Sequence, residues 1–139
     1  MNQSNRLKKW RKASLGIWCG RFLSTIFITF MLTASVLPKF LFPEMAIPTL
    51  EQLGWPAKYL LLIGTIELVG TLLYSYSKTA IIGAILLTGL LGGALAAQLR
   101  VEAALFTHVL FSLYLGIFMW GGLWLRNPRL RTIINSFKE

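Results

Sequence analysis

Apolar residues dominate four long runs of this chain, and the charged residues other than Glu67 lie at its ends and in the connections between the runs. Three of the runs contain no charged residue, and the second contains one, Glu67. Each run is close in length to the roughly 20 residues that an α-helix needs to cross about 30 Å of hydrocarbon. The pattern predicts four transmembrane helices, at about residues 18–40, 57–76, 79–99 and 103–125.

The composition supports this interpretation over a soluble fold. Of the 139 residues, 55% are hydrophobic and 14% are charged, whereas a soluble domain carries about 25% charged residues. The predicted fold class is all-α, a four-transmembrane-helix bundle that forms a single membrane domain over residues 1–139. Its basic tails are residues 1–17 and 126–139. The predicted surroundings are a lipid bilayer.

The net charge is +9, and the basic residues flank the apolar runs and do not form one folded basic face. Under the predicted topology, ten positive residues lie on one side of the membrane: Arg6, Lys8, Lys9, Arg11, Lys12, Lys78, Arg126, Arg129, Arg131 and Lys138. The other side has Lys39, Lys58 and Arg100. The positive-inside rule then predicts that both termini are cytoplasmic, in a multi-pass protein of the cell membrane, the inner membrane of a bacterium. Nucleic acid is not an expected partner.

The connection between the first two spans contains signals for a short helix at the membrane interface. Thr49 and Gln52 have the spacing of a capping box directly after Pro48, and Gly54 is placed to end a helix that begins there. Tyr74 and Tyr76 close the second span, where tyrosines gather at the headgroup level. We therefore expect an interfacial helix from Thr49 and an interfacial position for both tyrosines.

Glu67 is the most informative polar residue, because an ionised carboxylate at mid-membrane costs about 2.5–3.5 kcal/mol on insertion scales. Gly64 and Gly70 lie three residues before and after it, near the same helix face, where they let a neighbouring helix approach. Glu67 is thus expected to face protein. Lys39 is its leading candidate partner, because a side chain leans toward the N-terminus of its helix and so, at the outer end of the first span, toward the membrane.

Gly89 and Gly93 in the third span have a four-residue spacing that allows close helix packing in lipid. Two interpretations remain open for this face. It packs against another helix of the same chain, or it forms a homo-oligomer. Gly16 and Gly20 offer a second surface for dimerisation.

No catalytic group of residues is visible. The single cysteine, Cys19, excludes an intrachain disulfide relay, and the single histidine, His108, cannot supply a multi-histidine metal site. We therefore expect no catalytic residue, no metal and no enzyme activity. A candidate polar site near the outer side combines Glu67 and Lys39 with three residues from the ends of the third and fourth spans, namely Gln98, Arg100 and His108.

Several segments resemble the DoxX-like family, within the group of small four-helix membrane proteins that includes DoxX and MauE. The resemblance runs from about residue 22 to 129 and is carried by the sequences PKFL at 38–41, LGWP at 53–56, IGTIELVG at 63–70, IGA at 82–84 and GGA at 92–94. Where such proteins often have a histidine near the outer end of the third span, this chain has Gln98. The turn after the second span, Ser77-Lys78-Thr79, lacks the proline found there in relatives. The resemblance implies a four-helix fold and, for some relatives, association with quinone-linked or methylamine-oxidising redox systems. A quinone is the one cofactor that it implies.

Two hypotheses concern Glu67. In the first, it bonds between helices and fixes the bundle; in the second, it binds a proton, a quinone headgroup or a small cation. The function expected for the whole chain is that of a membrane accessory or interaction protein, with other membrane subunits as partners. The alternative is a small proton-coupled transporter that uses Glu67. Small multidrug exporters carry their glutamate in the first helix, whereas here it is in the second.

Overall fold

The structure is a computed structural model that describes residues 3–136. It is 88% helical, with no strand in the described part, and contains four helices long and apolar enough to cross a membrane. These candidate spans are Ser14–Leu41, Ala57–Ser75, Ala80–Arg100 and Leu105–Arg126. The predicted all-α four-helix membrane fold is confirmed.

The helices follow one another along the chain with short connections. The elements, in chain order, are α1 (Gln3–Phe30), the π-helical η1 (Met31–Val36), α2 (Leu37–Leu41), α3 (Pro43–Gln52), the 3₁₀ turn η2 (Ala57–Tyr59), α4 (Leu60–Ser75), α5 (Ala80–Arg100), the π-helical η3 (Leu105–Val109), α6 (Leu110–Arg126) and α7 (Pro128–Ser136).

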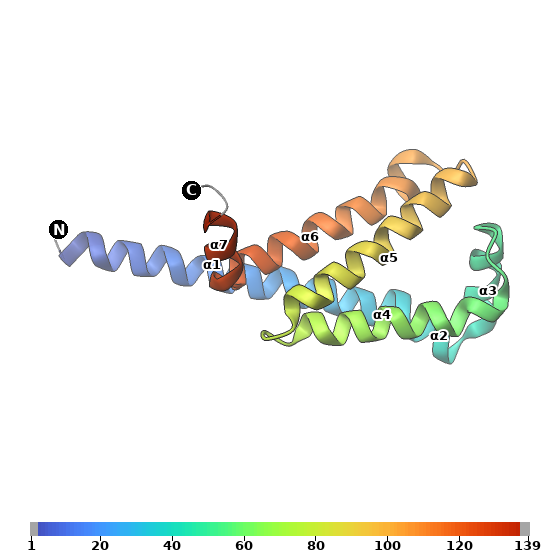
Figure 1. Ribbon diagram of the computed structural model, residues 1–139, viewed down its shortest axis with the longest axis horizontal. Helices are drawn as coiled ribbons and strands as arrows, with labels where there is room; N and C mark the ends of the chain where they lie inside the picture. Colours follow the sequence, from blue (N-terminus) through green and yellow to red (C-terminus); the bar gives the residue numbers. More distant parts are fainter. Residues whose placement is uncertain (1–2, 137–139) are drawn as a thin grey trace.

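The long helices form a closed ring of neighbours. Helix α1 packs mainly on α6, α6 on α5, α5 on α4, and α4 returns to η1 and α2. The start of α1, the α4–α5 turn and α7 lie at one end of the molecule, and α3 lies at the other (Figure 1). The ring brings the first and second spans side by side, which the site requires.

The first span continues through a proline. Pro38 has no N–H group and its ring crowds the carbonyl four residues earlier, so an uninterrupted α-helix is disfavoured there. The chain instead forms the wider π-helix η1, in which the N–H of Leu37 donates to the carbonyl of Leu32. The helix then runs on as α2 to Leu41. Lys39 therefore belongs to the first membrane-spanning segment.

The helix in the first connection begins earlier than predicted. Helix α3 starts at Pro43, in the first turn, where the missing N–H of a proline is not needed. Thr49 thus lies inside the helix and does not cap it. The predicted end is correct: Gly54 has φ of 76°, its N–H donates to Glu51 O at 2.8 Å, and Trp55 N donates to Leu50 O at 3.1 Å. This pair of bonds is a Schellman cap.

Glycines allow two close helix crossings. A Cβ atom on Gly83 of α5 would lie 2.7 Å from both the carbonyl oxygen of Gly70 and the Cα of Tyr74 on α4. One on Gly20 of α1 would lie 2.9 Å from the carbonyl oxygen of Gly122 on α6. The predicted dimer surface at Gly16 and Gly20 is therefore wrong for Gly20, because this glycine is already used inside the chain.

Tyr74 is a core residue and not the interfacial residue predicted from its place at the end of a span. It is fully buried, whereas Tyr76 is 72% exposed. The Tyr74 hydroxyl donates to the Met119 carbonyl at 2.8 Å and lies 3.0 Å from the hydroxyl of Ser24. Its ring packs edge-on against Phe27 at 5.2 Å. Because its polar atom has partners on two other helices, burial leaves it satisfied.

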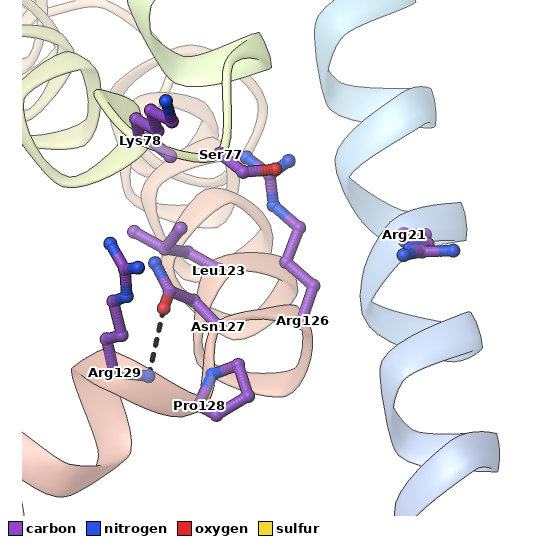
Figure 2. Close-up of a pocket in the computed structure, with 9 residues that line it drawn as sticks. Arg21, Ser77, Lys78, Leu123, Arg126, Asn127, Pro128 and Arg129 are labelled. Carbon is purple, nitrogen blue, oxygen red and sulfur yellow. Dashed lines mark hydrogen bonds between the residues drawn. The ribbon is translucent and has the colours of Figure 1, made fainter.

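The fourth span ends where α6 meets α7. Helix α6 ends at Arg126, and α7 begins two residues later at Pro128. Between them, Asn127 uses its side-chain oxygen to accept a hydrogen bond from the N–H of Arg129 at 3.1 Å (Figure 2). This is the bond that an N-cap residue makes, so Asn127 sets the point at which the chain turns into α7.

Candidate functional site: an ion pair between α2 and α4

Lys39 and Glu67 form an ion pair inside the membrane portion of the fold. The Lys39 Nζ lies 2.9 Å from the Glu67 Oε2, and the two side chains are 16% and 9% exposed. Lys39 comes from α2 at the end of the first span, and Glu67 from the middle of α4. The pairing gives the mid-membrane carboxylate the opposite charge that its burial requires.

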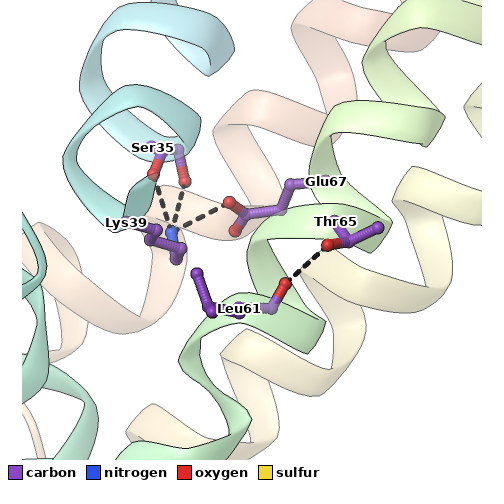
Figure 3. A network of polar contacts seen from close by, with 5 residues as sticks. All are labelled: Ser35, Lys39, Leu61, Thr65 and Glu67. Carbon is purple, nitrogen blue, oxygen red and sulfur yellow. Dashed lines mark hydrogen bonds and ion pairs between the residues drawn. The ribbon is translucent and has the colours of Figure 1, made fainter. Parts of the chain in front are cut away.

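Ser35 completes the surroundings of the ammonium group. Lys39 Nζ donates to the Ser35 carbonyl at 2.9 Å and is 3.0 Å from the Ser35 hydroxyl (Figure 3). An ammonium group has three N–H donors, and the third goes to Glu67. Because Ser35 lies four residues before Lys39, the side chain folds back along its own helix toward the membrane, as the lean of helical side chains favours.

Gly64 gives α2 access to the carboxylate. A Cβ on Gly64 would lie 3.3 Å from the Lys39 Cβ and 3.1 Å from the ring of Phe40. A methyl group on this residue would require the Lys39 and Phe40 side chains to shift by a few tenths of an ångström, next to Glu67, which lies one turn further along α4. Gly70 serves a different neighbour, because a Cβ there would lie 2.8 Å from Leu87 on α5. The two glycines that flank Glu67 thus admit two separate helices.

The other predicted members of the polar site do not join this pair. In the described part of the chain, no hydrogen bond or ion pair connects Gln98, Arg100 or His108 to Lys39 or Glu67. Arg100 donates to the Leu53 carbonyl at 2.6 Å and so ties the end of α5 to the end of α3. His108 is exposed and its Nδ1 lies 2.8 Å from the Thr107 hydroxyl. Gln98 is half-buried.

Gly89 and Gly93 lie on an open face of α5. Among the described residues, a Cβ on either glycine or on Gly92 would lie within 4 Å of no atom of another helix. These glycines therefore make no close contact with another described helix, so the intramolecular packing that their spacing allowed is not observed at them.

Buried polar groups that the sequence did not single out continue from Glu67 along α4. Thr71 and Tyr74, four and seven residues after Glu67, share its face and are fully buried. Among the described residues, the Thr71 hydroxyl has no hydrogen-bond partner. The same helical spacing could have found both residues, and the four-residue step from Lys39 could have found Ser35. The polar groups therefore follow one stripe and not a cluster at the outer side.

The side chains that commonly bind metal ions do not cluster in the described part of the chain. In residues 3–136, no three His, Cys, Asp or Glu side chains gather in a way that could hold a metal ion. Cys19 is exposed.

The fold and the buried ion pair define a small multi-pass membrane protein whose first two spans are joined through a lysine and a glutamate. The model of the DoxX-like family matches residues 22–122, well over half of the chain, and the chain belongs to this family. This confirms the resemblance noted in the sequence. A search of curated proteins and a search of solved structures each found no match.

Proposed function

We propose that this chain is a membrane accessory or interaction protein without catalytic activity of its own, and that the Lys39–Glu67 pair fastens its bundle. The observation that carries the proposal is that each of the three ammonium donors of Lys39 has an acceptor within the chain. A lysine engaged in this way has no donor left for a ligand, and its charge already neutralises Glu67. Such a pair suits a fixed structural contact.

The open face of α5 supports an interaction role. Gly89, Gly92 and Gly93 are exposed within a candidate span. In lipid, helices associate through close packing and not through a hydrophobic force, so a small-residue face suits contact with a helix of another subunit. The DoxX-like resemblance suggests that the subunit belongs to a membrane redox system, in which the partner would hold the quinone.

Co-purification tests this proposal. The full chain is solubilised in mild detergent and its partners are identified for the wild type, for Gly93→Leu and for Gly116→Leu. Gly116 of α6 also meets no atom within 4 Å, so the third protein controls for a bulky residue on an open glycine. We expect the wild type and Gly116→Leu to co-purify with the same membrane partner in stoichiometric amount, and we expect Gly93→Leu to lose this partner. Recovery of the wild type without any stoichiometric partner would contradict the proposal.

The proposed location is the bacterial inner membrane, with both termini in the cytoplasm. The start of α1 and the end of α7 lie at the same end of the molecule (Figure 1). Most of the basic residues of the sequence belong to these two segments and to the α4–α5 turn. The positive-inside rule assigns such an end to the cytoplasm. Reporter fusions at each terminus that are active only in the periplasm should both remain inactive.

A second candidate function is proton-coupled transport. It is favoured by the buried stripe of Glu67, Thr71 and Tyr74, in which the Thr71 hydroxyl has no hydrogen-bond partner in the described part of the chain. Ionisable residues within membrane spans, such as Glu67, are characteristic of proton paths, and polar groups in line with Glu67 would extend such a path. Proton flux in proteoliposomes that disappears with Glu67→Gln and persists with Glu51→Gln, a change in α3, would establish this function. No flux above that of empty liposomes would reject it.

A further inference from the structure

A cavity of about 420 Å³ lies at the end of the bundle that carries the termini, away from the ion pair. This volume is within the range of roughly 300–1,000 Å³ that is common for ligand sites. The cavity is lined by Arg21, Ser77, Lys78, Ala80, Leu123, Arg126, Asn127, Pro128 and Arg129. It therefore lies between α1, the α4–α5 turn and the junction of α6 with α7.

The lining is strongly basic. Four of its nine residues are arginine or lysine, and none is acidic. In Figure 2, the Arg126 side chain extends from the end of α6 toward the turn that carries Ser77, and Arg21 lies on α1 to the right of Arg126. Cationic side chains from separate segments repel one another, and an anion bound in the cavity would relieve this repulsion. The amide of Asn127 and the hydroxyl of Ser77 add polar groups.

Arg126 is held in place at the edge of the cavity. One of its terminal nitrogens donates to the Tyr74 carbonyl, and the guanidinium lies 4.6 Å from the centre of the Tyr74 ring. These contacts fix the position of the guanidinium group. Its Nε–H is enclosed by the protein and has no hydrogen-bond partner in the part of the chain that the structure describes. Guanidinium groups match phosphate oxygens especially well, so an anion in the cavity would meet Arg126 at its terminal nitrogens.

We propose that this cavity binds the phosphate group of an anionic membrane lipid. Arg126 is the last residue of the fourth candidate span, so the cavity lies at the depth where one leaflet places its headgroups. Basic pockets between membrane helices on the cytoplasmic side are known to hold such headgroups. The lipid would contact α1, the α4–α5 turn and α6 at once, so its binding would hold these segments together.

Lipid titration by native mass spectrometry tests this proposal on the full chain, stripped of lipid in detergent. The probes are phosphatidylglycerol, which is anionic, and phosphatidylcholine, which has a phosphate but no net charge. The cavity variant is Lys78→Gln with Arg129→Gln, two exposed residues. The control is Lys8→Gln with Lys12→Gln, which removes the same charge from the start of α1, a helix whose described side chains contribute only Arg21 to the lining.

The wild type should bind phosphatidylglycerol more tightly than phosphatidylcholine. The cavity variant should bind phosphatidylglycerol roughly tenfold or more weakly, since each basic residue near anionic lipid contributes about fivefold, whereas the control should stay close to the wild type. Equal losses in the two double variants, or equal binding of the two lipids, would overturn the proposal. So would displacement of phosphatidylglycerol by millimolar inorganic phosphate, which would assign the site to a soluble phosphate compound.

Two further variants guard against a folding defect. Lys78→Gln alone changes only the exposed α4–α5 turn and should still weaken phosphatidylglycerol binding. Lys78→Arg with Arg129→Lys keeps both charges and should bind like the wild type. Loss of binding in this charge-conserving variant would also overturn the proposal.

Discussion

The hydroxyl of Tyr74 on α4 lies 3.0 Å from the hydroxyl of Ser24 on α1, deep in the bundle. The same phenol donates to the Met119 carbonyl on α6, so one side chain links three helices. The three spans that this side chain joins are far apart in the sequence. We therefore expect Tyr74 to be important for the packing of the bundle.

The first prediction concerns this contact. Tyr74→Phe should lower the free energy of unfolding by roughly 0.6–2 kcal/mol, the range of single interhelical hydrogen bonds in membrane proteins. Thermal unfolding in detergent measures the change. Tyr114→Phe removes the hydroxyl of a 45% exposed tyrosine of α6 and should have little effect. Equal stability of the Tyr74 variant and the wild type would show that the phenol bonds contribute nothing.

The second prediction compares two glycines of α5. Gly83→Ala would force a methyl group against the backbone of Gly70 and Tyr74 and should cost about 1–3 kcal/mol, as overpacking does. Gly93→Ala places the same methyl in open space and should leave the stability unchanged or slightly higher, because alanine favours the helix. Melting temperatures of the two proteins decide the matter. If both variants melted together, the α4–α5 crossing would not be as close as described.

The third prediction concerns the end of α3. Gly54 has a positive φ of 76°, a conformation that costs other residues roughly 1–2 kcal/mol. A Cβ there would also lie 2.6 Å from the Arg100 side chain, which donates to Leu53. Gly54→Ala should therefore loosen the link between α3 and α5. Hydrogen exchange should rise at the N–H groups of Gly54 and Trp55, while Gly16→Ala, on an open glycine of α1, should leave their exchange unchanged.

The sequence was sufficient to predict the spans, because their apolar length depends on bilayer thickness and not on tertiary contacts. The proximity of Lys39 and Glu67 could also be anticipated. Few charges occur within the spans, and each needs a partner there. The DoxX-like motifs added the family and its four-helix architecture.

Other features depended on how the helices pack, which one sequence does not contain. Tyr74 looks like an interfacial residue until Ser24 and Met119 are brought beside it. Thr49 looks like a cap, but Pro43 can begin a helix earlier, and a local pattern does not decide between two valid starts. Gly20 and Gly93 both belong to small-residue patterns, yet one packs inside the chain and the other faces outward.

The fourth prediction addresses the central claim, that the Lys39–Glu67 pair fastens the bundle. Removing one member leaves a buried charge without its partner, which typically costs 3–5 kcal/mol, whereas replacing both with apolar residues is often neutral. Lys39→Met and Glu67→Leu should each be strongly destabilised. Glu67→Gln should be affected less, because its amide oxygen still accepts a hydrogen bond from Lys39.

The most direct test is the double-mutant cycle of these two residues, measured as the free energy of unfolding in detergent. The double variant should be more stable than either single variant, with a coupling energy of roughly 2 kcal/mol or more, at the upper end of the range for residues in contact. The contradicting result is additivity, in which the double variant loses the sum of the two single losses. Lys39 and Glu67 would then act independently, and the pair would not hold the first two spans together.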